Sequence, residues 1–421
     1  MNLISKNSWI FFILICPFIF FFTPKIDKFS NSEISCFKKI NYEKTTIFIH
    51  NCDAHSITSS SENFSNYLFD WEDNPWKGRP IHILLGTALS PIIYPFSLVP
   101  KMFFFRKLNY NGIRKNYLSK LPIYISFYLV NFFLLVILSK IAFFILNTTN
   151  NLEKVLVSIL FSTTDMVNAW FWTAHSIFFG HIIPLVGLLS FLIGFYSNEI
   201  SSKRFISFAF ILGMGCLIYQ MSILWIGMFI FGIAFKNVEL LVTKKTLYFV
   251  ATFLAPIFIW MILTFSFGIS IFFEASKHSQ FMWLFKIFDE SYRDTHGNFL
   301  NIITQHLLVF FDNFSNSFGY QWIPSTFLIT YCIVKKKLKL IRLITNPIVI
   351  ASISIFIVQC LFNYIQDENQ TRFINPLITV LTLVSLWLFK KFDKKSLPFA
   401  ICFLIFFQMV FAFSKPPISL S

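Results

Sequence analysis

The chain has 421 residues, of which 56% are hydrophobic and only 13% are charged, and its formal net charge at pH 7 is +15. This composition excludes an ordinary soluble domain and predicts an all-α polytopic membrane protein, with a single membrane domain over residues 1–421. The basic residues are scattered over short turns instead of forming one folded face with stacking aromatics. Nucleic acid is therefore not an expected partner.

Apolar runs along the chain are long enough to cross a hydrocarbon core as helices. We predict about 11 transmembrane helices. The run from 205 to 235 is too long for one ordinary helix, and we divide it at Tyr219-Gln220. In chain order the predicted spans lie near 8–23, 81–104, 121–146, 177–197, 205–219, 221–235, 246–268, 317–334, 344–362, 373–389 and 397–413.

The charge distribution orients these spans in the membrane. With a cytoplasmic N-terminus, the cytoplasmic side carries 21 Lys and Arg residues against three acidic residues, and the outer side carries 13 against 17. Such an asymmetry follows the positive-inside rule. Membrane lipids are the expected surroundings. The many Phe, Ile, Lys and Asn residues indicate an AT-rich, bacterial genome, so the expected location is a bacterial inner membrane. The predicted cytoplasmic connections are 105–120, 198–204, 236–245, 335–343 and 390–396.

The first apolar segment follows Lys6 and has no evident A-x-A cleavage site, so we interpret it as an anchor. The first outer loop, 24–80, contains Cys36 and Cys52, and we predict that these two cysteines form a disulfide in the outer compartment. No Cys/His spacing in the chain resembles a metal site.

Two further outer loops, 147–176 and 269–316, are too interrupted by polar residues to be spans. Their apolar residues alternate with charges, which predicts interfacial helices lying over a membrane-embedded cavity. The same pattern equally fits linkers that rest on the lipid headgroups.

Several catalytic classes lack their sequence signatures here. The chain has neither a glycine-rich phosphate loop nor a G-x-S-x-G elbow, which disfavours an ATP-driven pump and a serine hydrolase. The centres of the predicted spans are almost free of charge, which disfavours an ion-coupled transporter.

Charged residues gather in two outer clusters. The first runs from IHNCDAHS (49–56) to FDWEDNPWKGRP (69–80), and the second is NYIQDENQTRFINPL (363–377). A carboxylate at a membrane surface can take the proton of an acceptor hydroxyl, and a membrane-edge arginine matches phosphate bidentately. Together they suit transfer from a lipid-linked phosphate donor. The alternative interpretation is structural, with snorkelling anchors and a solvated rim.

The arrangement resembles the GT-C class of integral-membrane glycosyltransferases, which use polyprenyl-phosphate-linked sugars. That class has an essential Asp or Glu in its first outer loop, often followed in bacterial members by Arg-Pro at the next span. The matching positions are Asp53 in NCDAHS and Arg79-Pro80 in KGRPIHILLG. An interfacial helix in the second outer loop is matched loosely by 152–175, and a late arginine that meets the donor phosphate is matched by Arg372 in ENQTRFINPL.

The resemblance implies inverting transfer of a sugar from a polyprenyl-phosphate carrier to a glycan or lipid acceptor on the outer face, without a soluble cofactor. Asp53 would remove the acceptor proton. Because Ala54 follows it where the class often has a second acid, Asp73 in DWED is the alternative base.

The resemblance also implies which residues hold the substrates. Arg372, with Arg79 or His175, would hold the departing phosphate. We assign substrate binding to His55, Asp165 and Glu368, and we leave the participation of a divalent metal open.

Two other functions fit part of the pattern. An O-antigen or capsule polymerase or ligase also has outer-loop arginines and lipid-linked glycans, but it does not need an acid after the first span. A lipid or glycan flippase or transporter would need a path that opens alternately to both faces.

Overall fold

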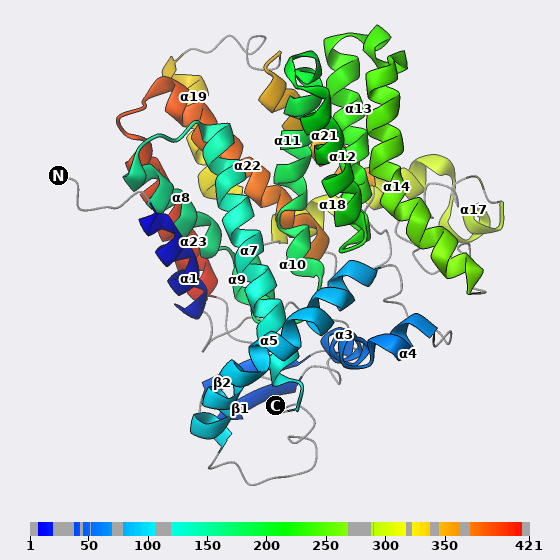
Figure 1. Ribbon diagram of the computed structural model, residues 1–421. Helices are drawn as coiled ribbons and strands as arrows, with labels where there is room; N and C mark the ends of the chain where they lie inside the picture. The colour runs from blue at the N-terminus through cyan, green and yellow to red at the C-terminus, as the bar shows by residue number, and fades with distance from the viewer. Residues whose placement is uncertain are drawn as a thin grey trace.

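The computed structural model describes residues 7–19, 38–42, 45–50, 52–69, 79–105, 119–267, 288, 290–316, 322–336, 345–361 and 371–414. This part of the chain is almost entirely helical (Figure 1). In chain order the elements are α1 (Ser8–Ile19), β1 (Lys38–Tyr42), β2 (Thr45–His50), α3 (Cys52–Glu62), α4 (Phe64–Phe69), α5 (Pro80–Phe105), α7 (Leu121–Leu146), α8 (Asn151–Ser162), α9 (Asp165–Trp170), α10 (Ile177–Gly180), α11 (Ile183–Phe195), η1 (Ser197–Glu199), α12 (Ser202–Cys216), η2 (Gln220–Ile223), α13 (Leu224–Lys236), η3 (Val238–Val242), α14 (Lys244–Ser266), α17 (Glu290–His296), α18 (Phe299–Asn316), α19 (Trp322–Lys336), α21 (Pro347–Leu361), α22 (Thr371–Phe392) and α23 (Leu397–Ser414).

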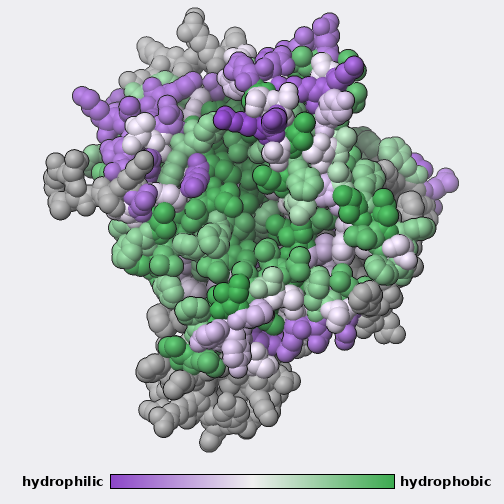
Figure 2. All heavy atoms as spheres, viewed as in Figure 1, coloured by the Kyte–Doolittle hydropathy of each residue, from purple (hydrophilic) through white to green (hydrophobic). Residues whose placement is uncertain are grey.

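The helices form a bundle with an apolar girdle. Figure 2 shows a broad hydrophobic band between hydrophilic residues at the upper and lower ends of the view. Within the described ranges, four segments are long and apolar enough to cross a membrane: Pro80–Val99, Leu121–Leu146, Ile177–Phe195 and Lys244–Ser266. Shorter apolar helices accompany them, among them α1, α13, α19, α21 and α23. The structure therefore has the helical, apolar character of a membrane protein.

The predicted division of the 205–235 run is present. Helix α12 ends at Cys216, and α13 begins at Leu224 after the short 3-10 helix η2. Close packing holds these helices to their neighbours, because a Cβ atom added to Gly213 would lie 2.1 Å from the carbonyl oxygen of Phe253. Small residues at such contacts let backbones approach closely in membrane bundles.

One β-hairpin departs from the all-α expectation. Strands β1 and β2 pair antiparallel, with Lys38 opposite His50 and an irregularity between Ile40 and Asn41. The TTIFIH run forms β2, because its β-branched and aromatic residues favour an extended strand. The fold is thus helical apart from this hairpin in the first outer segment.

Helices α3 and α4 also lie in the first outer segment, and α3 packs on the start of α5. The Ser61 hydroxyl donates to the carbonyls of Ile57 (2.9 Å) and Ile83 (3.2 Å), and Thr87 Oγ1 donates to the Ser61 carbonyl (2.8 Å). A Cβ atom at Gly86 would lie 2.6 Å from Ser61 Oγ, so glycine permits this approach. Apolar residues of α3, α5 and α7 close the contact in a small separate core.

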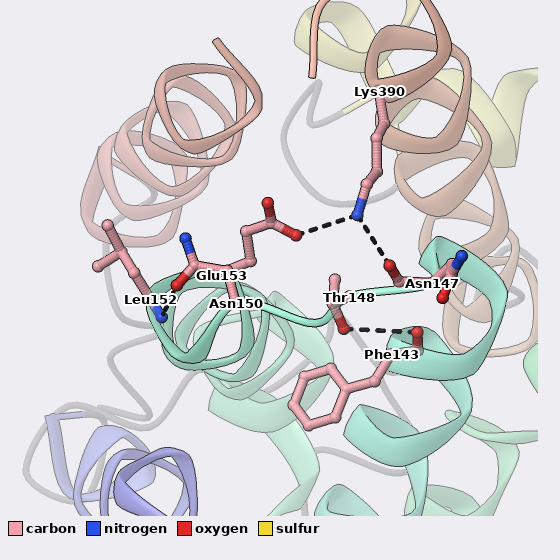
Figure 3. Close-up of polar contacts among 7 residues, drawn as sticks. All are labelled: Phe143, Asn147, Thr148, Asn150, Leu152, Glu153 and Lys390. Atoms are coloured by element: carbon pink, nitrogen blue, oxygen red, sulfur yellow. Dashed lines mark hydrogen bonds and ion pairs between the residues drawn. The ribbon is translucent and has the colours of Figure 1, made fainter. Parts of the chain in front are cut away.

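Each end of the bundle is named after one residue. The end where α7 stops and α8 begins is uppermost in Figure 1, and it is called the Lys390 end because Lys390, in the last turn of α22, lies there. There Lys390 Nζ donates to Glu153 Oε2 and to the carbonyl of Asn147, both at 3.0 Å (Figure 3). The Arg79 end contains Arg79, immediately before α5, and lies opposite.

The segment 147–176 differs from the predicted interfacial loop. Helices α8 and α9 occupy it, and most of their residues are buried against α1, α7 and α23. Its low hydropathy predicted a surface segment, but its polar groups have partners inside the bundle. Glu153 pairs with Lys390, and Thr164 caps α9 by accepting from the Val167 N–H. Buried polar groups are tolerated when they are paired in this way.

In the segment 269–316, residues 268–287 lie outside the described ranges. Helix α18 is amphipathic, as expected: it buries Ile302, His306 and Phe310, while Leu300 and Leu308 are exposed. His306 Nε2 donates to the Cys360 carbonyl at the end of α21 (2.7 Å). Burial lowers the pKa of His306, and this hydrogen bond opposes the shift.

Candidate functional site

Arg79 lies at the junction of three segments that are distant in sequence. Its Nη1 donates a hydrogen bond to Ser176 Oγ, and its guanidinium carbon lies 4.9 Å from the centre of the Tyr219 ring. The backbone holds the same junction together, because the Ile81 N–H donates to the Leu217 carbonyl at 3.2 Å. The break between α12 and η2 therefore packs against the first turn of α5.

Two histidines flank this junction. His82 Nε2 donates to the Ala174 carbonyl at 2.9 Å, and its ring stacks on Phe127 of α7 at 4.5 Å. His175 is buried, and its Nδ1 accepts from the Ile177 N–H at 2.8 Å. Both imidazoles thereby order the backbone of the 174–177 segment beside Arg79.

A small cavity adjoins Tyr219 and extends the junction toward α21 and α22. Tyr219, Gly180, Gln359 and Pro376 are among its lining residues. Its volume of about 10 Å³ holds about one water molecule. A lipid-linked sugar does not fit into this space, so the cavity marks where α10, α21 and α22 converge and is not a formed substrate pocket.

Arg372 belongs to the helix on the far side of this cavity. It lies in the first turn of α22, four residues before the cavity-lining Pro376 and seven before Thr379. Thr379 Oγ1 contacts His181 Nδ1 at 3.3 Å, and His181 Nε2 contacts Thr164 Oγ1 at 3.4 Å. Residues seven positions apart lie on the same face of a helix. Arg372 is therefore on the same face of α22 as Thr379, the face that meets α10 and α11.

The two predicted first-loop acids are placed unequally. Asp53 and His55 lie in the first turn of α3, the helix that packs on the start of α5, and their side chains are outside the described part. Asp73 lies outside the described ranges altogether. The structure thus brings the helix carrying Asp53 to the Arg79 end without placing its carboxylate.

Among the remaining predicted residues, the structure describes Asp165 but not Glu368 or Cys36. Asp165 is buried at the first position of α9, directly after the capping Thr164. Glu368 lies outside the described ranges, as does Cys36, so the predicted disulfide between Cys36 and Cys52 lies outside them too. Of the predicted residues, Arg79 and His175 are those whose described side chains belong to one junction.

Lys120 connects α7 to the helix that carries Asp53. Its Nζ donates to Ser59 Oγ and lies 3.8 Å from Glu62 Oε2, so both contacts are with α3. Burial lowers the pKa of Lys120, and the Glu62 carboxylate opposes that shift. The contact holds α3 against the first turn of α7.

Sequence reasoning missed several members of the junction. Tyr219 served only as a dividing point between spans, and His82, Ser176 and Gln359 carried no pattern of their own. The available signal was the polar pair Tyr219-Gln220 inside an otherwise apolar run. Among the residues that the structure describes, no group of three or more His, Cys, Asp or Glu side chains could hold a metal ion.

Comparison with known proteins adds no relative. No family model, no curated protein and no solved structure matches the chain. The resemblance to the GT-C class therefore rests on the motif positions given above.

Proposed function

We propose that the protein is a membrane glycosyltransferase of the GT-C type, which moves a sugar from a polyprenyl-phosphate donor to a glycan or lipid acceptor. The observation that carries the proposal is the Arg79 junction. An arginine at the start of an apolar helix is held by Ser176 and Tyr219, beside a cavity whose far wall is the helix that carries Arg372. Two arginines at one end of the bundle suit a phosphate that departs at the membrane surface.

The proposed reaction assigns a role to each end of the donor. The acceptor oxygen bonds to the anomeric carbon while the bond from that carbon to the phosphate oxygen breaks. The acceptor proton passes to Asp53, or to Asp73, and the lipid phosphate leaves with the bonding electron pair. Arg372 and Arg79 stabilise the charge that develops on the phosphate, with His175 beside them. His55, Asp165 and Glu368 remain proposed substrate contacts.

The proposal includes a place in the cell. The protein would lie in a bacterial inner membrane with about 11 crossings, a cytoplasmic N-terminus and the Arg79 end outside. The basic connections 198–204, 236–245, 335–343 and 390–396 on the cytoplasmic side support this orientation. Lipid-linked sugar would be the donor, and no soluble cofactor is required by the residues assigned.

The proposal is tested with the full-length protein in phosphatidylcholine vesicles and a panel of polyprenyl-phosphate hexoses and pentoses. The measurement is the release of polyprenyl phosphate that depends on an added acceptor lipid extract. We expect Asp53→Asn or Asp73→Asn to abolish transfer, and Arg79→Ala to weaken donor binding about tenfold to a hundredfold, because a lost charge-assisted hydrogen bond costs about 1.5–3 kcal/mol.

Matched controls come from α17, where Arg293 and Asp294 are exposed. Arg293→Ala and Asp294→Asn should leave transfer unchanged. Full activity in each of the single variants Asp53→Asn, Asp73→Asn and Arg372→Ala would overturn the mechanism. Equal labelling of cavity positions from both membrane faces would instead favour a transporter.

A further inference from the structure

The two ends of α7 lie at opposite ends of the bundle. Lys120, immediately before α7, contacts Ser59 and Glu62 of α3, while Asn147, immediately after α7, accepts from Lys390. The 26 residues of α7 extend about 39 Å, which exceeds the hydrocarbon thickness of about 30 Å. Helix α7 therefore runs the full distance between the Arg79 end and the Lys390 end.

Helix α5 begins at the same end of the bundle as α7. Its first turn is held by Ser176 and Leu217, and Gly86 faces the ring of Phe127 in the second turn of α7. The connection from α5 to α7 arrives at Lys120, again at the Arg79 end. Residues 80 and 120 therefore both lie at the Arg79 end. A single membrane crossing by α5 would instead place them at opposite ends.

Helices α8 and α9, unlike α5, extend from the Lys390 end to the Arg79 end of the bundle. Glu153 in the first turn of α8 pairs with Lys390, and the chain after α9 reaches Ala174, which accepts from His82 beside Phe127. Phe127 and Asn147 are 20 positions apart in α7, or about 30 Å of helix. The segment 151–176 therefore spans about one hydrocarbon thickness.

An apolar, uncovered face distinguishes the second half of α5. On one face of the helix, Ile92, Phe96 and Val99 are 64%, 68% and 57% exposed. Figure 1 shows α5 running obliquely beneath the lower end of α7 toward the β-hairpin instead of upward beside the bundle.

We propose that α5 does not cross the membrane and that its exposed face lies in the lipid leaflet at the Arg79 end, while α8 and α9 make a crossing in its place. The partner is the bilayer itself, because the uncovered residues are aliphatic and aromatic. The number of crossings stays at about 11. Arg79 and Lys120 then lie on one side of the membrane, and Asn147–Asn150 lie on the opposite, Lys390 side. This proposal does not rest on the proposed enzymatic activity.

Cysteine labelling distinguishes the two arrangements. In a variant without native cysteines, Asn111→Cys and Thr149→Cys are treated in intact cells with a membrane-impermeant maleimide. Asn66→Cys in α4 serves as the Arg79-end reference. Ser201→Cys serves as the Lys390-end reference, because it precedes α12, whose other end meets the Arg79 junction through Leu217. We expect Asn111→Cys to label like Asn66→Cys, and Thr149→Cys to label like Ser201→Cys. The reverse pairing would overturn the proposal, and Lys115→Cys replaces Asn111→Cys if that variant does not accumulate.

Depth measurements test the lipid contact separately. Spin labels at Ile92→Cys, Phe96→Cys and Val99→Cys in phosphatidylcholine vesicles report accessibility to oxygen and to a water-soluble nickel complex. We expect all three to favour oxygen and to lie within about 5–10 Å of the headgroup boundary. Depths that increase by about 1.5 Å per residue through the bilayer centre would show a crossing helix. Preferential access to nickel would show a water-exposed helix, and either result would overturn the proposal.

Discussion

Glu153 and Lys390 form a largely buried ion pair, with 3.0 Å between Oε2 and Nζ, that joins the first turn of α8 to the last turn of α22 (Figure 3). Only 7% and 14% of these side chains are exposed. Lys390 also binds the Asn147 carbonyl, which follows α7 in a left-handed conformation. Three helix ends therefore depend on one ammonium group.

Removing either partner of this pair should destabilise the fold strongly. We expect Glu153→Gln or Lys390→Met to lower the free energy of unfolding by about 3–5 kcal/mol, because each leaves an uncompensated buried charge or dipole. Thermal unfolding in detergent measures the loss. Lys394→Met, at an exposed position, is the matched control and should change stability little. Single variants with the same midpoint of thermal unfolding as the wild type would contradict the role of the pair.

The double variant Glu153→Leu/Lys390→Met, compared with the single variants Glu153→Leu and Lys390→Met, sharpens this test. Replacing a buried pair by apolar residues is often neutral or stabilising, so the double variant should be more stable than the sum of the single changes predicts. Strict additivity would mean that the two side chains do not interact.

Substitution of two glycines in α13 by alanine should change stability in opposite directions. A Cβ atom at Gly232 would lie 2.4 Å from the Phe191 carbonyl oxygen, whereas Gly227 has nothing within 4 Å. We expect Gly232→Ala to destabilise by about 1–3 kcal/mol through overpacking, and Gly227→Ala to stabilise by about 0.4–1 kcal/mol by reducing the entropy of the unfolded chain. The midpoints of thermal unfolding compare the two. Equal shifts in both variants would mean that α11 and α13 do not pack as described.

Lys120 should make stability depend on pH in the alkaline range. Burial lowers its pKa below the ordinary value of 10.5, so the folded protein releases this proton before the unfolded chain does. The unfolded state then binds more protons, and the stability contribution of Lys120 rises as the pH rises toward 10.5. Thermal unfolding between about pH 8 and 10.5 measures the rise, which Lys120→Arg should remove because the guanidinium stays charged. An identical pH profile for Lys120→Arg would contradict this origin.

Tyr219 should act through its ring and not through its hydroxyl. If the face of the ring holds the Arg79 guanidinium, Tyr219→Phe keeps the affinity for polyprenyl phosphate, and Tyr219→Leu weakens it about 2- to 30-fold, since a cation–π contact contributes about 0.5–2 kcal/mol. The dissociation constant in detergent micelles is the measurement. A loss of affinity in Tyr219→Phe equal to that in Tyr219→Leu would assign the effect to the hydroxyl instead.

The apolar runs were sufficient to predict many individual helices. Leu121–Leu146 and Lys244–Ser266 follow from uninterrupted hydropathy, and the break after Cys216 follows from Tyr219-Gln220. These features are readable because each depends on neighbouring residues and on the solvent they face.

Polar residues whose partners are distant in sequence could not be interpreted in the same way. Glu153 makes α8 look like a surface helix until Lys390, 237 positions later, neutralises it. Arg79 looks like a membrane-edge anchor until Ser176 and Tyr219 enclose it.

The sequence by itself therefore determined that this is a helical membrane protein and where most of its helices lie, because burial of apolar surface depends on local hydropathy. The tertiary structure alone decided which ends of those helices meet. That choice depends on pairing between charges, hydroxyls and carbonyls that only the folded chain brings within hydrogen-bond distance. For the same reason hydropathy ranks α5 above α8 as a span, while the contacts of Lys120 and Lys390 favour the opposite order.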